Sequence, residues 1–302
     1  MNLLGDVMPL PPLASGWRRW PAPAKLNLFL RVVGRRNDGM HRLQTVFQLL
    51  DWGDQVDLRV RTDGRIERGA GAEGVAAEDD LAVRAARLLQ VASATAAGAD
   101  IVVHKRIPQG GGFGGGSSNA ATVLMALNRM WGVSWGEERL TRLGLELGAD
   151  VPVFVRGHSA WAEGVGEQLT PVSLPPRWYV LIHSGVHVAT AELFQDAELT
   201  RNAPPLKMAD FVLDWAGQNA FTPLVRSRSP RLAAVLDAVA ALGQGGMTGT
   251  GGGCFLLADS EADARRKAAA LAHLGRVQVA QGTQHSVLLD ALSGWPGTEV
   301  SG

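Results

Sequence analysis

The chain has 302 residues, of which 46% are hydrophobic, and it carries 29 basic and 29 acidic side chains. This length and composition predict a substantial core and two domains of ordinary size. The balanced charge argues against nucleic acid or a membrane as partner, and no apolar run approaches the length of a bilayer span. The single cysteine, Cys254, excludes an internal disulfide and a cysteine-based zinc site, so a cytoplasmic location is expected.

Residues 1–20 are expected to be a disordered extension. They include Pro9, Pro11 and Pro12, and they lack a basic region ahead of their short apolar patch, so they do not make a signal peptide. An upstream start codon, adding residues that the fold does not use, is the alternative.

The chain that follows is predicted to be rich in strands. Alternating apolar residues from Leu26 to Val32 predict a strand with one apolar face, so that Lys25 and Asn27 share the other face. Further strands are expected near 43–50 and 55–61, after a turn.

Helices and strands alternate in the rest of the chain, a pattern typical of α+β folds. Prolines at 171, 175 and 176 place the domain boundary after residue 170. The predicted helices, besides one after residue 115, are 81–92, 137–147, 190–197, 207–214, 231–242 and 261–274. The predicted strands or extended runs are 100–107, 151–155, 160–169, 178–183, 254–258 and a closing strand near Val277.

The most informative segment is a loop with six glycines between Gly110 and Gly116, which precedes a helix with a buried face. Glycine permits positive φ and a close approach of the backbone, and the N–H groups of a helix start face an anion, so the loop predicts a phosphate site. A dinucleotide-binding fold is disfavoured, because no acidic residue follows about twenty positions later. A P-loop lysine is also missing, and a flexible linker is the remaining alternative.

Other candidates have ordinary explanations when each is taken alone. Lys25 could be a solvated charge on a strand, Asp150 a turn or helix-end cap, and His41 a surface histidine. A second glycine cluster, Gly249 to Gly253, could be a tight turn, although four glycines exceed what one turn needs. Together with the first loop, these parts predict phosphoryl transfer, which depends on positioning and charge stabilisation.

The segments Pro23–Asn27, Pro108–Ala121 and Thr248–Cys254 resemble, in order, the three motifs of the GHMP kinases. The resemblance covers about residues 20 to 290. Within this family, the chain most resembles the branch that acts on 4-diphosphocytidyl-2-C-methyl-D-erythritol. The residues that carry this narrower resemblance are Pro23–Leu30, Gly34–Gly39, His41–Val46, Leu50–Asp54, Leu147–Phe154 and Phe194–Asn202.

The resemblance implies an ATP-dependent kinase that phosphorylates the 2-hydroxyl of this cytidine diphosphate substrate, with Mg²⁺ accompanying ATP, on the non-mevalonate route to isoprenoids. It also implies an α+β GHMP kinase fold. Residues 21–170 would form a ribosomal-protein-S5-like ATP-binding domain and residues 171–302 a ferredoxin-like C-terminal domain, with the active site between them. The sequence leaves the oligomeric state open.

Site roles follow from the same motifs. Asp150 would accept or orient the hydroxyl proton, and Lys25 would favour the alkoxide and hold Asp150 ionised. Ser117 or Ser118 would contact phosphate or metal, with Ser117 as the candidate metal ligand. The residues expected to wrap the ATP phosphates are Pro108, Gln109, Gly110, Gly111, Gly112, Phe113, Gly114, Gly115, Gly116, Ser117 and Ser118. The expected substrate-binding residues are Asn27, Met40, His41, Phe194, Thr250 and Gly251.

One departure concerns the base-binding end, where His41 would read the cytosine edge. Met40 stands where the family usually has tyrosine, so Phe194 would pack on the cytosine with the polarizable Met40 thioether against the opposite face. Other GHMP kinases, acting on homoserine, mevalonate or a sugar, are the nearest alternatives. A non-catalytic nucleotide-binding protein of the same fold is another, which the presence of both Lys25 and Asp150 disfavours.

Overall fold

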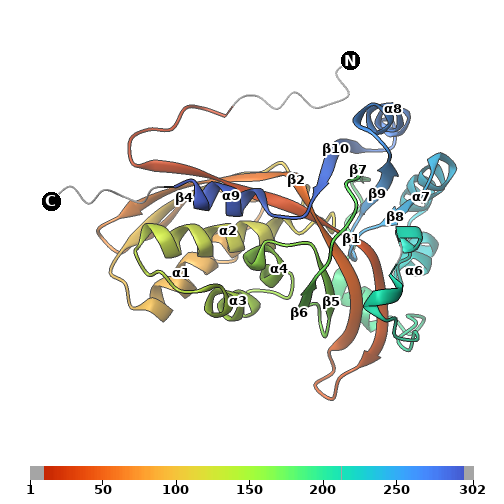
Figure 1. The fold of residues 1–302 in the computed structure, drawn as a ribbon, viewed down its shortest axis with the longest axis horizontal. Coiled ribbons are helices and arrows are strands. Elements are labelled where there is room, and N and C mark those ends of the chain that lie inside the picture. Colours follow the sequence, from red (N-terminus) through yellow and green to blue (C-terminus); the bar gives the residue numbers. More distant parts are fainter. Residues whose placement is uncertain (1–9, 212, 296–302) are drawn as a thin grey trace.

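The computed structural model describes residues 10–211 and 213–295, whose strands form a ten-stranded sheet flanked by helices (Figure 1). The order along its main path is β3-β4-β2-β10-β7-β9-β8, with β1 and β5 also paired to β2, and β6 paired to β5. The strands are Trp17–Arg35 (β1), His41–Arg61 (β2), Ile66–Ala70 (β3), Gly98–His104 (β4), Ala160–Glu163 (β5), Gln168–Pro171 (β6), Trp178–His183 (β7), Gly245–Met247 (β8), Gly253–Ala258 (β9) and Arg276–Thr283 (β10). The α-helices are Leu81–Ser93 (α1), Gly115–Met130 (α2), Glu137–Leu145 (α3), Val151–Arg156 (α4), Thr190–Gln195 (α5), Thr222–Arg228 (α6), Pro230–Leu242 (α7), Glu261–Leu271 (α8) and Val287–Ser293 (α9).

A long antiparallel hairpin of β1 and β2 forms the backbone of the molecule. Register shifts interrupt its pairing, for example between Pro23 and Lys25, and bend the strands. The two strands predicted at 43–50 and 55–61 are therefore parts of one strand, β2. The hairpin also begins earlier than expected. Residues 17–20 of the predicted extension belong to β1, because the indole of Trp20 is buried in the core; residues 1–9 lie outside the described residues.

Strands β1 to β6 form a first group within the sheet, and helices α1 to α4 cover one face of this group and enclose the larger hydrophobic core (Figure 1). Helix α2 is buried along most of its length, as its periodicity predicts. The prediction of an extended run at 151–155 was wrong, since these residues form α4. The apolar, β-branched run resembles a buried strand, but Pro152 stands in the first turn of the helix, where proline is tolerated.

The second group of strands, β7 to β10, carries helices α7 and α8 on its outer side (Figure 1). A separate core lies between them, with Leu232, Val235 and Leu256 fully buried. The helix predicted at 207–214 is replaced by two short 3₁₀ turns, Met208–Asp210 and Leu213–Trp215. Sequence reasoning missed β3, β8, α6 and α9, which are all of seven residues or fewer.

The two groups of strands are joined at β10, which pairs with β7 along its length and with β2 at Gly282 and Thr283. After β10, helix α9 packs against β1 and contributes Leu288 and Leu292 to the first core. The last described helix therefore returns to the N-terminal half. The boundary predicted after residue 170 stays a prediction.

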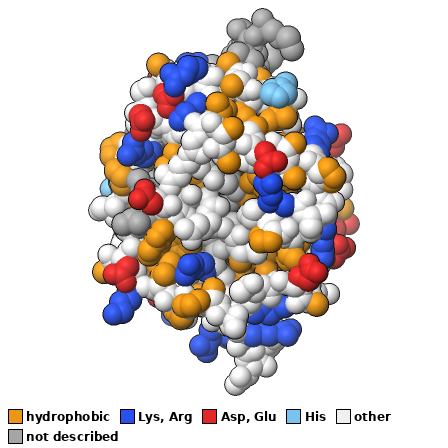
Figure 2. Space-filling model, turned by 90° about the vertical axis from the view of Figure 1, so that its right-hand side faces the viewer, with side chains coloured by type: hydrophobic (Ala, Val, Ile, Leu, Met, Phe, Trp, Pro, Cys, Tyr) orange, Lys and Arg blue, Asp and Glu red, His pale blue; other side chains and the backbone are white. Residues whose placement is uncertain are grey.

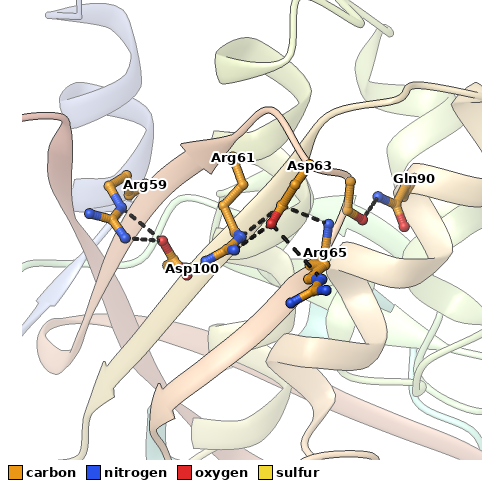
Figure 3. Close-up of polar contacts among 7 residues, drawn as sticks. Arg59, Arg61, Asp63, Arg65, Gln90 and Asp100 are labelled. Atoms are coloured by element: carbon orange, nitrogen blue, oxygen red, sulfur yellow. Dashed lines mark hydrogen bonds and ion pairs between the residues drawn. The ribbon is translucent and has the colours of Figure 1, made fainter.

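The face of β2 and β4 opposite the core carries charged pairs across the strands (Figure 3). Asp100 accepts from Arg59 and Arg61, and Arg61 also donates to Asp63. Burial alone would raise the pKa of Asp100, but the bonds from Arg61 and Arg59 outweigh it and lower the pKa. These pairs leave this face of the sheet hydrophilic without creating a field of one sign.

The surface agrees with the balanced composition. On the face drawn in Figure 2, basic and acidic side chains are interspersed, and neither sign gathers into a broad patch. None of the helices within residues 10–211 and 213–295 has the length and apolar character needed to cross a membrane.

Candidate active site

Lys25 and Asp150 come from distant parts of the chain and meet in one pocket. Lys25 lies on β1 with only 2% of its surface exposed, and its Nζ is 3.1 Å from Oδ2 of Asp150. Asp150 directly precedes α4, and its side chain makes no capping hydrogen bond there. Lys25 is therefore not a solvated charge, and Asp150 does not cap its helix; the two form an ion pair.

A chain of hydrogen bonds fixes the lysine. The side-chain amide of Asn27 accepts from Lys25 Nζ through Oδ1, at 2.5 Å, and donates through Nδ2 to Oγ1 of Thr45, at 3.0 Å. The backbone N–H of Asn27 donates to Oγ1 of Thr248 at 2.8 Å, and Thr45 donates to the carbonyl of Phe29. Because every member is buried, this network holds the ammonium in one place.

The pocket that contains this ion pair has a volume of about 630 Å³ and runs between the two halves of the protein. It joins the Lys25 and Asp150 end to a second end, where rings from β2 and α5 face each other. Residues that line it include Lys25, Asn27, Met40, His41, Thr45, Phe47, Ser117, Asp150, Thr190, Phe194 and Thr250.

At the second end, His41 at the start of β2 lies beside Phe194 on α5. Their ring centres are 5.0 Å apart and the planes are tilted by 31°. Burial, with Arg201 and Arg35 nearby, lowers the pKa of His41, which favours the neutral imidazole. Met40 is half exposed at the mouth of this end.

The first glycine loop leads into α2 as its composition predicts. Gly110, Gly112 and Gly114 all have positive φ, and Gly114 precedes the helix without a side-chain cap. The first intrahelical bond joins the N–H of Ser118 to the carbonyl of Gly114, at 2.8 Å. The N–H groups just before Ser118 therefore have no partner in the helix, which suits binding of phosphate oxygens.

The second glycine cluster packs directly against the first loop. The N–H of Gly252 donates to the carbonyl of Gly110 at 3.0 Å, and a Cβ at Gly251 would lie 2.1 Å from the same oxygen. A Cβ at Gly112 would lie 2.2 Å from the carbonyl oxygen of Thr248. Several glycines are thus required because the two loop backbones touch, which explains why the second cluster has more glycines than a single turn needs.

The two serines of the predicted phosphate site differ in position. Ser117 lines the pocket, whereas Ser118 is completely buried and its hydroxyl has no hydrogen-bond partner in the described part of the chain. Within residues 10–211 and 213–295, no three His, Cys, Asp or Glu side chains gather as a metal site. The Ser117 hydroxyl in the pocket is an oxygen ligand of the kind Mg²⁺ takes, and this ion is often held by one or two protein groups together with substrate phosphates.

A buried carboxylate anchors the start of the glycine loop. Oδ1 of Asp54 accepts from the backbone N–H groups of Arg106 and Ile107, at 2.6 and 2.8 Å. Its Oδ2 accepts from Lys105 Nζ and from Asn119 Nδ2 on α2. Asp54 therefore ties strand β2 to both the loop and its helix.

The structure thus brings both predicted catalytic residues and most of the predicted substrate-binding residues to one pocket, but of the predicted ATP-binding residues only Ser117 lines it. Gly251 packs against the glycine loop, Phe113 is buried beneath it, and Gln109 donates to the carbonyl of Glu73. Sequence reasoning missed Thr45 and Arg201 as supporting residues. Both lie in segments of the narrower resemblance, so their position beside predicted residues was the available signal.

Comparison with known proteins agrees with this geometry. Residues 80–158 match the GHMP kinases N terminal domain, and residues 208–277 match the GHMP kinases C terminal family. A 4-diphosphocytidyl-2-C-methyl-D-erythritol kinase of Xanthomonas campestris pv. campestris (strain B100) is 59% identical over 91% of this chain and 94% of its own length. The enzyme of that name from Xylella fastidiosa (strain 9a5c) is 53% identical, over 92% and 93%. The chain belongs to the 4-diphosphocytidyl-2-C-methyl-D-erythritol kinase family, within the GHMP kinases.

Solved structures agree with this assignment. A crystal structure of 4-(cytidine 5'-diphospho)-2C-methyl-D-erythritol kinase has a TM-score of 0.77 and 34% identity, covering 88% of this chain and 99% of that one. A homoserine kinase from Cytophaga hutchinsonii, with a TM-score of 0.65 at 16% identity over 92% and 98%, shares the fold alone. The predicted α+β GHMP kinase fold is confirmed, and the chain is an ATP-dependent small-molecule kinase that uses Mg²⁺ with ATP.

Proposed function

We propose that this chain transfers the γ-phosphate of ATP to the 2-hydroxyl of 4-diphosphocytidyl-2-C-methyl-D-erythritol, in the methylerythritol phosphate route to isoprenoid precursors. The observation that carries the proposal is one pocket that joins a buried lysine–aspartate pair to a pair of facing rings, His41 and Phe194. A substrate with an alcohol at one end and a flat base at the other fits this arrangement. The 53 to 59% identity to enzymes named for this substrate supports it.

We assign the chemistry at the alcohol end to Asp150 and Lys25. Asp150 receives or orients the proton of the attacking hydroxyl, and the Lys25 ammonium, 3.1 Å from it, stabilises the charge that develops on the oxygen. Phosphoryl transfer through a loose transition state needs little early deprotonation, so alignment of the hydroxyl is the larger contribution. The Asn27 network serves this alignment, because it holds Lys25 in place.

We assign the phosphates of ATP to the glycine loop and the start of α2. Backbone N–H groups before Ser118 and the positive end of a 16-residue helix favour the phosphate oxygens. Ser117 is the residue that would contact the metal or a phosphate, since its side chain lines the pocket. Mg²⁺, when bound with ATP, would neutralise charge on the phosphates.

We assign the base end to His41, Phe194 and Met40, with Thr250, which is hydrogen-bonded to Thr190 at the start of α5, also lining the pocket. The two rings offer a flat apolar surface, and the imidazole adds polar atoms that a base edge can bind.

A panel of alcohols tests the proposal. ADP release with Mg-ATP would be measured for 4-diphosphocytidyl-2-C-methyl-D-erythritol, homoserine, mevalonate and galactose. We expect turnover with the cytidine substrate to exceed that with the others by about a thousandfold or more, because the others leave the base end empty. Faster turnover with any of the other three would contradict the proposal.

A further inference from the structure

Arg201, in the segment that follows α5, joins the two rings at the base end of the pocket. Its Nε donates to Nε2 of His41 at 3.1 Å. Its Nη2 donates to the carbonyls of Phe194 and Asp196 at 2.9 and 2.6 Å, and its Nη1 to that of Leu199 at 3.1 Å. One guanidinium thus connects the start of β2 to the end of α5.

These contacts decide which nitrogen of His41 carries the proton. A guanidinium donates hydrogen bonds and accepts none, so Nε2 of His41 must be the unprotonated nitrogen. The neutral ring then has its proton on Nδ1, and no partner for Nδ1 is found among residues 10–211 and 213–295. The lowered pKa of His41 agrees with a neutral ring. His41 therefore offers the pocket one N–H donor and no positive charge.

The same contacts set the relation between the rings. Phe194 makes an edge-type contact with Phe221, with ring centres 4.8 Å apart, and a tilted contact with His41. Because Arg201 holds both the imidazole nitrogen and the backbone carbonyl of Phe194, a shift of the imidazole or of the backbone at Phe194 would break one of its bonds. The surface that meets the base is thereby set before substrate arrives.

We propose that Arg201 is a positioning residue for the pyrimidine base: it holds His41 in the Nδ1–H form beside Phe194, so that a fixed donor faces an acceptor atom of the base. The inference rests on the proposed function, since it concerns the cytidine end of that substrate. Cytosine presents two such acceptors, its ring N3 and its carbonyl O2. Arg201 acts through His41 and does not itself touch the substrate.

The tautomer can be measured without any substrate. Nitrogen-15 chemical shifts of the His41 ring, recorded by two-dimensional NMR on the ligand-free chain, should show a protonated Nδ1 and an unprotonated Nε2. In Arg201→Met the preference should disappear, because methionine removes the donor. A protonated Nε2 in the unchanged protein would overturn the proposal, whatever the substrate proves to be.

Affinity is the second readout. In Arg201→Met, the KM for the cytidine substrate and the Kd for free CDP, measured by calorimetry, should each rise by about tenfold, because a charge-assisted hydrogen bond is lost. The KM for ATP and kcat should stay within about twofold, because the reacting groups are untouched. Arg31→Met is the matched control. Arg31 also tethers this connection, through the carbonyl of Pro204, but does not contact His41.

If Arg201→Met does not fold, Arg201→Lys is the second variant, because lysine keeps the charge but cannot reach four acceptors at once. It should also weaken CDP binding while its circular dichroism stays unchanged. An unaltered Kd for CDP in a folded variant would overturn the role of Arg201. CDP binding by the unchanged chain without any turnover would count against the proposed reaction only, whereas failure to bind CDP would overturn both.

Discussion

At the scale of single residues, the site depends on a charge that is costly to bury. Lys25 is almost fully enclosed and is stabilised by Asp150, by Asn27 and by the face of the Phe47 ring, 5.2 Å from its Nζ. Replacing Asp150 or Asn27 would leave the buried Lys25 ammonium without a partner. Replacing Lys25 leaves only the side chains of Asp150 and Asn27, which border the pocket. The lysine is therefore better tested by replacement with an apolar side chain of similar length.

Lys25→Met should fold and lose activity. We expect kcat to fall by about a hundredfold or more, because the charge that stabilises the attacking oxygen is removed, while methionine fills the same volume. ADP release and thermal unfolding would be measured together, with exposed Lys207→Met as control. A variant that raises only the KM for ATP would show that Lys25 serves binding and not the transition state.

Met40→Tyr should strengthen substrate binding. Met40 is 52% exposed at the base end, where a tyrosine ring could cover the face of cytosine opposite Phe194. The expected gain is less than about 1.5 kcal/mol, or up to about tenfold in the dissociation constant measured by calorimetry with CDP. No change in that constant would mean that the thioether already serves as well as a ring.

At the scale of elements, the glycine loop and α2 depend on the second glycine cluster. Gly112→Ala should reduce affinity for an ATP analogue by about tenfold or more, because the new side chain would displace the loop. The alanine Cβ would lie 2.2 Å from the Thr248 carbonyl oxygen, and the φ of +74° at this position disfavours any residue with a Cβ. A fluorescent ATP analogue gives the dissociation constant. Gly136→Ala, whose Cβ meets open space, is the control. Equal affinities in the two variants would contradict the packing argument.

Elements with a clear period were predictable from sequence, and those defined by tertiary contact were not. The helices α1, α2, α7 and α8 follow their apolar spacing closely. The run at 151–155 reads as a strand because its residues are buried on all sides, and only Pro152 hints at a helix start. Short elements such as α9 carry too few turns for a period to emerge.

The candidate site shows the same division. Lys25, Asp150, His41 and Phe194 stood out through their motifs, and the structure brings them to one pocket. Apart from its place in a segment of the narrower resemblance, nothing in the sequence revealed the role of Arg201, because its bond to His41 joins residues 160 positions apart. Partners in a hydrogen-bond network are set by the folded arrangement and leave no spacing in the sequence.

At the scale of the whole molecule, the two halves are built into one another. Strand β10 bridges the two groups of strands, and α9 then returns to the first core. The pocket that holds Lys25 and His41 lies where the long hairpin meets the second half. The relative placement of the alcohol and base ends is thus fixed by the sheet itself.

Leu288→Ala should destabilise the N-terminal half although it lies near the far end of the chain. Leu288 is fully buried in the first core, so the expected loss is about 2 to 5 kcal/mol in the free energy of unfolding, measured in urea. Exposed Leu145→Ala should cost far less. Similar losses in the two variants would show that α9 is not part of that core.

The central claim, that one pocket aligns an alcohol with ATP through Asp150, is tested most directly by a single comparison. ADP release from Mg-ATP with 4-diphosphocytidyl-2-C-methyl-D-erythritol would be measured for the unchanged chain, for Asp150→Asn and for the exposed neighbour Glu146→Gln. Turnover should fall by about 10²-fold to 10⁴-fold in Asp150→Asn, with CDP binding intact, and should be unchanged in Glu146→Gln. Turnover by Asp150→Asn within a few fold of the unchanged chain would contradict the account.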